Sequence, residues 1–254
     1  MRKLKYPIAA FLLLIGLWQL VIYLGHYPGT LFPSPYSVGK ALLKMLFINH
    51  LLKDIAASMY RFSIGYLAAV TSGILLGLIL GWFPKLFRYV NPICQLIRPI
   101  SPIAWLPFIV LWFGIGDIPA IVIIFLAAFF PVLLSTVSAV KNVDEIYLKV
   151  AKNFGMKRHN VLFKIVFPAS FPQIANSLHL ALGSAWVFLV AGEMSGAQTG
   201  LGFLIIDARN NLRTDVLLGT ILVIGIIGLL LDSLIKLFEK KVLNNWGIVA
   251  KERG

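Results

Sequence analysis

Apolar runs long enough to cross a membrane recur along the chain, and they constrain its fold more than any other feature. A helix of about 20 apolar residues spans the hydrocarbon core of a bilayer. Candidate runs lie near residues 7–24, 59–83, 89–113, 118–140, 171–193 and 215–237. Lipid offers the backbone no hydrogen-bond partners, so spanning segments are helices or closed barrels. The runs are too continuous for alternating barrel strands, and we predict an all-α, polytopic membrane protein with about six transmembrane helices.

The distribution of positive charge predicts how these spans are oriented. Cytoplasmic loops near membrane spans carry an excess of Lys and Arg. If the N-terminus is cytoplasmic, 17 of the 23 Lys and Arg residues fall on the cytoplasmic side. The cytoplasmic groups are then Arg2 to Lys5, Lys85 to Arg98, Lys141 to Lys164 and Lys236 to Arg253. We therefore expect both termini in the cytoplasm, and the formal net charge of +13 follows from topology rather than from binding to nucleic acid.

The N-terminal segment has a basic start followed by an apolar run, as a secretory signal does. The run is long for a signal core, and His26, Tyr27 and Pro28 follow it instead of a small-residue cleavage site. We expect a retained anchor. The domain prediction is a cytoplasmic N-terminus and anchor over 1–30, an extracytoplasmic connection over 31–57, a transmembrane domain over 58–240 and a cytoplasmic tail over 241–254. Val38, Leu42, Met45 and Leu46 predict a surface helix in the connection.

Several kinds of chemistry find no support in the sequence. The single cysteine, Cys94, excludes an intrachain disulfide and a cysteine-cluster metal site. The chain has no G-x4-G-K-[ST] loop to hold ATP phosphates and no H-E-x2-H pair to hold zinc. We therefore expect no catalytic residues, no metal and no cofactor bound by this chain.

A basic segment, "KVAKNFGMKRHNVLFKIVFP" (149–168), interrupts the apolar pattern between two spans. Asn142 and Glu145 predict a helix start with a capping box. Gly155 is placed to end that helix in the left-handed conformation, and a second short helix is expected to stop at Pro168. Two interpretations remain open at this point. The segment is either an ordinary interfacial connector or a rigid element that docks into a groove of a soluble partner.

The spacing within this segment resembles a known cytoplasmic motif. Permease subunits of bacterial ATP-binding-cassette (ABC) importers carry the pattern E-A-A-x3-G-x9-I-x-L-P. Ala151, Gly155, Ile165 and Pro168 stand at the spacing of that motif. The chain departs from it at three positions, which are Lys149, Val150 and Phe167. Lys149 replaces the motif's acidic residue, although Glu145 lies one turn earlier.

The resemblance covers nearly the whole chain after residue 30. The segments "RPISPIAWLPFIVLWFGIGD" (98–117), "FFPVLLSTVSAVKNVD" (129–144) and "AGEMSGAQTGLGFLIIDARNNLRTD" (191–215) are similar to permeases of the nitrate, sulfonate and taurine importer group. That family implies a type I importer fold in the bacterial inner membrane. It implies a homodimer, a cytoplasmic ABC ATPase dimer that holds ATP and Mg, and an extracytoplasmic solute-binding protein.

The same resemblance implies roles for residues and a class of substrate. The coupling loop to the ATPase would be 141–170, with Lys149, Ala151, Phe154, Gly155, Met156, Ile165 and Pro168 as its site residues. A small anion such as a sulfonate, taurine or nitrate is the implied substrate. A thiamine-precursor pyrimidine or another small organic solute is the alternative within the family.

Glycines at every fourth position form a smooth ridge on the second span. Gly73, Gly77 and Gly81 would let another helix approach closely. Packing within the subunit is the favoured interpretation, and a dimer interface is the alternative.

Two features of the predicted spans are candidates for the translocation path. One is the set of three prolines that breaks the third span, and the other is Glu193 at the end of the fifth. A disturbed helix within a membrane is tolerated where it is buried in protein or lines a cavity. We therefore place Pro99, Pro102, Trp105 and Pro107 on the translocation path, the alternative being a tilted start to an ordinary span. Glu193 is placed on the same path, because a buried carboxylate there would need a partner and would suggest function. The alternative is an interfacial acid, which would carry no such role. The spans show no concentrated anion site.

Two other function classes make different predictions. An ion-coupled secondary transporter needs intramembrane acids or histidines as a relay, and the middles of the spans supply none that stands out. Gln173, Asn176 and His179 in the fifth span are expected to form interhelical hydrogen bonds. A membrane enzyme or scaffold would need a catalytic constellation or a large soluble surface, and neither is apparent.

Overall fold

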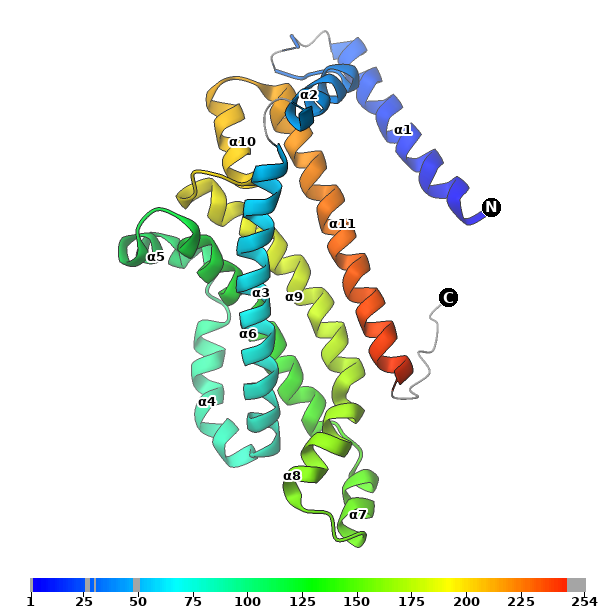
Figure 1. Cartoon of the computed structure of the whole chain (residues 1–254), viewed down its shortest axis with the longest axis vertical. Coiled ribbons are helices and arrows are strands. Elements are labelled where there is room, and N and C mark those ends of the chain that lie inside the picture. Colours follow the sequence, from blue (N-terminus) through cyan, green and yellow to red (C-terminus); the bar gives the residue numbers. More distant parts are fainter. Residues whose placement is uncertain (1, 26–27, 30, 48–50, 246–254) are drawn as a thin grey trace.

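Long helices form a bundle, and short helices lie at both of its ends (Figure 1). The computed structural model describes residues 2–25, 28–29, 31–47 and 51–245, and every regular element within them is helical. In chain order the elements are α1 (Arg2–Gly25), α2 (Pro35–Phe47), α3 (Leu51–Trp82), α4 (Pro84–Ile97), a 3₁₀ turn (Pro102–Trp105), α5 (Leu106–Phe113), α6 (Asp117–Lys141), α7 (Glu145–Asn153), α8 (Arg158–Val161), a π-helical turn (Leu162–Val166), α9 (Phe167–Gly196), α10 (Leu201–Asn210) and α11 (Thr214–Asn245). The all-α prediction is confirmed. Most of the predicted tail, residues 246–254, lies outside the described residues.

The predicted spans all fold as helices. Within the described residues, 4 helices are long and apolar enough to cross a membrane, or up to 5 if a bent pair is counted as one span. These are α3, α6, α9 with α8, and α11, with α4 and α5 as the bent pair. The first predicted span corresponds to α1, whose apolar part, Leu12–Gly25, is shorter.

The third span is broken, as its prolines predict. The segment carrying α4 and the segment 102–113 are bent by 83° relative to each other. Pro99 lies in the break, Pro102 begins the 3₁₀ turn and Pro107 stands in the first turn of α5. The charge count groups Arg98 with Lys85 and Arg88 in one cytoplasmic loop, but the structure separates them. Arg98 follows the last residue of the 14-residue α4, about 20 Å along the helix from its start.

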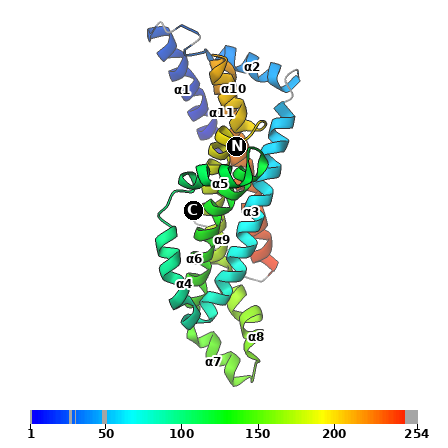
Figure 2. The ribbon, with the colours of Figure 1, turned by 90° about the vertical axis from the view of Figure 1, so that its left-hand side faces the viewer.

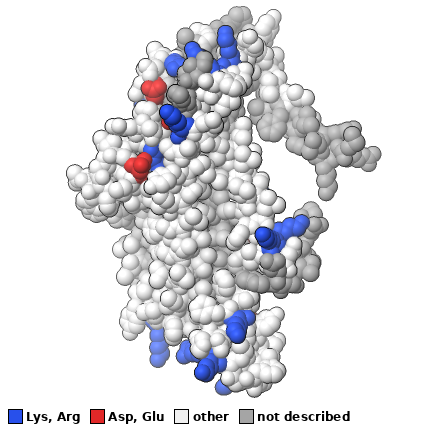
Figure 3. Space-filling model, viewed as in Figure 1, with Lys and Arg blue, Asp and Glu red and all other residues white. Residues whose placement is uncertain are grey.

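The two ends of the bundle differ in what they carry. α7 and α8 project at one end, and α2 and α10 lie at the other (Figures 1 and 2). Lys and Arg side chains gather over the α7–α8 end, near the end of α11 and at the opposite end, with a broad uncharged surface along the body (Figure 3). This distribution is expected of a bundle whose middle lies in lipid.

The core of the bundle lies between α3, α6 and α9. Phe62 on α3 stacks on Tyr66 with ring centroids 5.3 Å apart and meets the edge of Trp186 at the same distance. The hydroxyl of Tyr66 donates to the Leu178 carbonyl of α9 at 2.8 Å, and the indole N–H of Trp186 donates to the Ile224 carbonyl of α11 at 3.1 Å. These bonds satisfy buried donors and fix the helices relative to one another.

The glycine ridge of α3 faces α6 within the same chain. A Cβ added at Gly73 would lie 3.0 Å from Val132, at Gly77 2.5 Å from Thr136, and at Gly81 2.7 Å from Val140. Real Cβ atoms do not approach other heavy atoms as closely as at Gly77 and Gly81, and the contact at Gly73 would be tight, so the close approach of α3 and α6 depends on these glycines.

Replacing Gly77 by alanine is therefore expected to destabilise the protein by about 1–3 kcal/mol, because the added methyl group meets Thr136 and the Leu133 carbonyl. The measurement is the free energy of unfolding in detergent. Gly183→Ala is the matched control, since it is also a helical glycine but has nothing within 4 Å of an added Cβ. That variant should be neutral or more stable. Equal stability of the two variants would contradict the packing role of Gly77.

The predicted surface helix is α2, and its buried face is shifted from the expected stripe, of which only Val38 and Met45 are fully buried. Val38, Ala41 and Met45 are its buried residues, while Leu46 is 41% exposed. Ala41 and Met45 are one helical turn apart and pack in the main core. Leu42 contacts α11, where a Cβ at Gly219 would lie 3.2 Å from it.

One polar side chain of α9 joins α11. Nδ1 of His179 lies 3.1 Å from a carboxylate oxygen of Asp232, and its Nε2 lies 2.8 Å from Glu239. The predicted interhelical bonding of His179 is confirmed. Gln173 and Asn176 are exposed.

Candidate functional site

The segment between α6 and α9 forms a short helical hairpin. α7 begins after Asp144, whose side chain accepts a hydrogen bond from the Ile146 N–H at 2.9 Å. The predicted cap at Asn142 is therefore wrong. Asn142 instead ends α6, with its N–H bonded to the Ser138 carbonyl at 3.0 Å. Asp144 is the N-cap of α7 because its carboxylate stands directly before the first helical residue, where it reaches an unpaired N–H.

Gly155 makes the corner of the hairpin. Its φ of +66° is the left-handed conformation that the sequence predicts. The N–H of Gly155 donates to the Lys152 carbonyl at 3.0 Å, and the N–H of Met156 donates to the Ala151 carbonyl at 3.1 Å. This pair of bonds is a Schellman motif, which satisfies the last carbonyls of α7 and reverses the chain direction.

The inner face of the hairpin packs on the ends of two spans. Ala151 is 1% exposed and shares a small core with Leu78 of α3 and Val140 of α6. Val161, Leu162 and Val166, with the partly buried Met156 and Ile165, complete this core. The hairpin is thus anchored to α3 and α6.

The second short helix does not stop at Pro168, contrary to the prediction. α8 continues through the π-helical turn into α9, so that Arg158–Gly196 forms one apolar helical stretch of 39 residues. Pro168 lies in the first turn of α9. A proline is tolerated there because the π-helical turn directly before it, Leu162–Val166, adjusts the backbone hydrogen bonding around the missing N–H.

The outer face of α7 presents apolar side chains. Ile146, Tyr147, Val150 and Phe154 are 63%, 55%, 47% and 81% exposed, and we call these four the α7 patch. Lys149 stands beside the α7 patch, 73% exposed and 3.2 Å from the Glu145 carboxylate. An exposed apolar patch bordered by charge is a typical protein interaction surface.

The residues predicted for the translocation path do not lie together, because only two of the five line one cavity. Pro102 and Trp105 line a cavity of about 180 Å³ beside α6 and α9, with Arg98 at the same cavity. Pro99 and Pro107 are exposed and do not line it. Glu193 is 0% exposed and does not line this cavity either.

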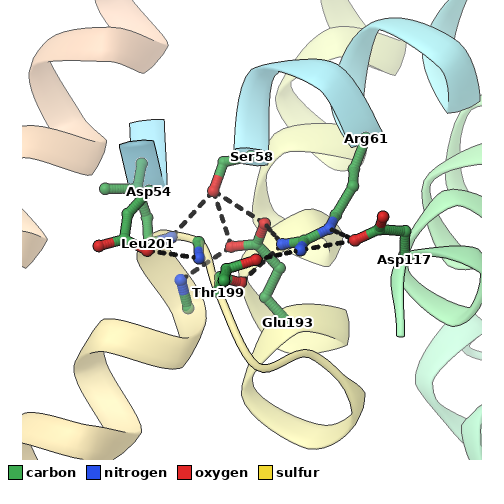
Figure 4. Close-up of polar contacts among 9 residues, drawn as sticks. Asp54, Ser58, Arg61, Asp117, Glu193, Thr199 and Leu201 are labelled. Carbon is green, nitrogen blue, oxygen red and sulfur yellow. Dashed lines mark hydrogen bonds and ion pairs between the residues drawn. The ribbon is translucent and has the colours of Figure 1, made fainter. Parts of the chain in front are cut away.

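Glu193 is the centre of a buried polar network at the α10 end of α9 (Figure 4). Its two carboxylate oxygens accept bonds from the Ser58 hydroxyl at 2.8 and 2.9 Å. Arg61 donates to one oxygen at 2.6 Å, and the Gly202 N–H donates to the other at 2.9 Å. The interpretation of Glu193 as an interfacial acid is wrong. It has the partner that a buried carboxylate requires.

Arg61 links three helices and a loop in this network (Figure 4). It is 2% exposed and binds Asp117, the first residue of α6, at 2.7 Å through both Nε and Nη2. Its remaining donors reach the Thr199 carbonyl and hydroxyl, each at 2.7 Å. The guanidinium of Arg61 is therefore paired with two carboxylates and a carbonyl, and none of its positive charge is available for a ligand.

The sequence interpretation missed this network because it began the second span too late. α3 begins at Leu51 instead of residue 59, so Asp54, Ser58 and Arg61 lie inside the helix. Their spacing of four and three residues places them on one helical face. This shared helical face is the sequence pattern that could have indicated the network. Asp54 accepts the Gly200 N–H at 2.9 Å, and the Ser58 hydroxyl oxygen accepts the Leu201 N–H at 2.9 Å.

Comparison with known families and proteins gives consistent matches. Residues 73–244 match the family described as binding-protein-dependent transport system inner membrane component. The chain is 35% identical over 246 residues to the taurine transport system permease protein of Escherichia coli, covering 95% of this chain and 90% of that protein.

Two further relatives carry other substrate names. A protein of Bacillus subtilis named for aliphatic sulfonates transport is 31% identical over 230 residues, with 91% of this chain and 83% of that protein covered. A nitrate import permease protein of Leptolyngbya laminosa is 32% identical over 243 residues, with 92% and 85% covered.

Among solved structures, the inward-facing MetNI methionine ABC transporter is similar, with a TM-score of 0.63 and 18% identity. The match covers 77% of this chain and 95% of that chain, and at this identity it shows a shared fold.

Proposed function

Since the chain belongs to the family of binding-protein-dependent transport system inner membrane components, we propose that two copies of it form the path by which an ABC importer moves a small anion. Membership makes the chain a multi-pass permease subunit of an ABC importer in the inner membrane. The anion is proposed because the names of three relatives specify aliphatic sulfonates, taurine and nitrate. All three carry an anionic group of oxygens around one central atom.

The α7–α8 hairpin is proposed as the element that docks into a cytoplasmic ABC ATPase. The observation that carries this assignment is the α7 patch, which is exposed on a hairpin held rigid by its Schellman corner and by the core beneath Ala151. Burying such a patch in a partner's groove is a common mode of helix recognition. ATP and Mg would then be bound and hydrolysed on the partner, and this chain would bind neither.

Motion of the docked hairpin would reach the membrane through continuous helix. α8 runs into α9 without a break, and α9 ends in the Arg61–Glu193 network, where α3 and α6 meet it. Closure of the ATPase dimer on ATP would move the hairpin and tilt these helices together, which changes the side to which the path opens. ATP drives this change only by binding one conformation more tightly than the other.

The remaining partners follow from the same topology. The α7–α8 end and both termini are proposed to be cytoplasmic, on the charge bias of the loops. The opposite end, with α2 and α10, would then face the extracytoplasmic solute-binding protein.

Phe154→Ser is expected to reduce the amount of ABC ATPase that copurifies with the protein by at least tenfold. Phe154 is 81% exposed, so its removal takes little from the fold. Burial of a phenylalanine in a partner contributes about 1.5–3 kcal/mol, or about tenfold to a hundredfold in affinity. The measurement is a mild-detergent pull-down from native membranes with quantitative mass spectrometry.

Asn153→Ser is the matched control, because Asn153 precedes Phe154 at the end of α7 and is also exposed. It should retain the ATPase. If a P-loop ATPase is absent from the wild-type sample, and the purified chain transports on an ion gradient alone, the docking proposal is wrong.

A further inference from the structure

Arg98 lies at the middle of the bundle, beside a cavity. The cavity of about 180 Å³ is also lined by Leu126, Ala127 and Phe130 of α6 and by Ser184 and Phe188 of α9. α6 runs from residue 117 to 141 and α9 from 167 to 196, so these wall residues lie near the middle of both spans. The cavity therefore lies at mid-depth, where both membrane surfaces are distant.

A charge at this depth requires an explanation. Arginine at the centre of a membrane span costs about 2.5–3.5 kcal/mol even on the more lenient insertion scales, and such residues mark substrate pathways. Arginines that merely snorkel keep their charge at the interface. Arg98 cannot be explained in that way, because it shares its cavity with mid-span residues.

Arg98, whose side chain is exposed, also differs from the buried Arg61 in having no protein partner. Among the described residues, its guanidinium forms no ion pair and no side-chain hydrogen bond. Arg61, by contrast, is paired with two acids. Among the described residues that line the cavity, Arg98 alone is charged, so none of them is an acid that competes for it.

The remaining walls limit what the cavity accepts. Trp105, Phe130 and Phe188 contribute aromatic surface, and the Ser184 hydroxyl at the wall donates to the Leu180 carbonyl of its own helix at 3.1 Å. The volume equals that of about six liquid water molecules, which admits a small solute and excludes a drug-sized one. The site thus offers one positive charge beside an aromatic surface.

From this geometry we propose that Arg98 binds the anionic head of the transported solute inside the membrane, while the aromatic walls contact its alkyl part. The substrate class is a small oxyanion, such as a short alkanesulfonate. The guanidinium suits such a group because its planar donors pair with two oxygens at once. This inference rests on the proposed function, and it adds a selectivity site within the permease itself.

The first test measures the electrostatic character of the cavity without transport. Cys94, the single cysteine, is replaced by alanine, and Ser184→Cys introduces a thiol into the cavity wall. The thiol is labelled in native membranes with sulfonatoethyl methanethiosulfonate or with trimethylammonioethyl methanethiosulfonate. We expect the ratio of the anionic to the cationic labelling rate to fall about tenfold in Arg98→Gln and to be restored in Arg98→Lys. An unchanged ratio in Arg98→Gln would overturn the proposal.

The second test measures transport by the complete complex in proteoliposomes. Arg98→Gln is expected to lower ATP-dependent uptake of ethanesulfonate and nitrate at least tenfold, with ATP hydrolysis retained. Arg88→Gln is the matched control, since Arg88 is an exposed arginine near the start of the same helix. Normal uptake by Arg98→Gln would refute the role of Arg98 while leaving the importer assignment intact. If the wild-type complex takes up neither anion, the proposed substrate class fails, and the labelling ratio still decides whether the cavity favours anions.

Discussion

Arg61→Met is expected to lower the free energy of unfolding by about 3–5 kcal/mol, because it leaves the fully buried Glu193 carboxylate without its cation. It also releases the Thr199 loop, which Arg61 holds by two hydrogen bonds. Methionine fills a similar volume and adds no charge, so the effect reports the loss of the ion pair. The measurement is unfolding of the purified protein in detergent, followed by tryptophan fluorescence.

Two further variants make this expectation specific. Arg61→Met combined with Glu193→Gln should recover more than half of the lost stability, because the amide needs no cation and can still accept from Ser58 or Gly202. Lys149→Met breaks the exposed pair with Glu145 and should change stability by less than about 1 kcal/mol. A double variant as unstable as Arg61→Met alone would show that the pairing of charge is not the cause.

Gly155→Val is expected to reduce ATP-dependent uptake at least tenfold while the protein still inserts into the membrane. The φ of +66° is a strained conformation for a β-branched residue, with a penalty of about 1–2 kcal/mol. Valine therefore favours another backbone conformation at the corner, which changes the direction of α8 relative to α7. The α7 patch would then no longer match the groove of the ATPase. Uptake in proteoliposomes and the amount of copurified ATPase are the two measurements.

Gly155→Asn separates conformation from size in this experiment. Asparagine adopts the left-handed conformation more readily than other residues with a Cβ. A Cβ at position 155 meets nothing within 4 Å, so a larger side chain causes no clash. We expect Gly155→Asn to transport at nearly the wild-type rate. Wild-type uptake by a well-expressed Gly155→Val would disprove the role of the corner in coupling.

The sequence by itself determined the features that depend on neighbours along the chain. Apolar runs defined the helical spans, because lipid leaves a lone segment no alternative that satisfies its backbone. Prolines predicted the break in the third span, and glycine predicted the left-handed corner at Gly155. Each of these outcomes is decided by local backbone chemistry, which the residue types specify directly.

The sequence-based expectations that the structure contradicts also came from local rules about residue types. The break expected at Pro168 assumes that proline ends a helix, but Pro168 follows a π-helical turn inside a continuous helical stretch, where local adjustment of the backbone accommodates it. The late start assigned to the second span assumes that Asp54 and Ser58 are too polar to lie in it. That assumption holds for unpaired side chains and fails when distant partners satisfy them.

Only the tertiary structure decided the partners and the surroundings of the charged side chains. Arg61 and Glu193 are 132 residues apart, and their pairing depends on α3 and α9 meeting at one depth. Arg98 appears in the sequence as one more basic residue near a cytoplasmic loop, and the folded length of α4 carries it to mid-depth. The energy of a charge depends on its dielectric surroundings and on the partners within a few ångströms. Those surroundings come from helix packing, which hydropathy and residue spacing do not encode.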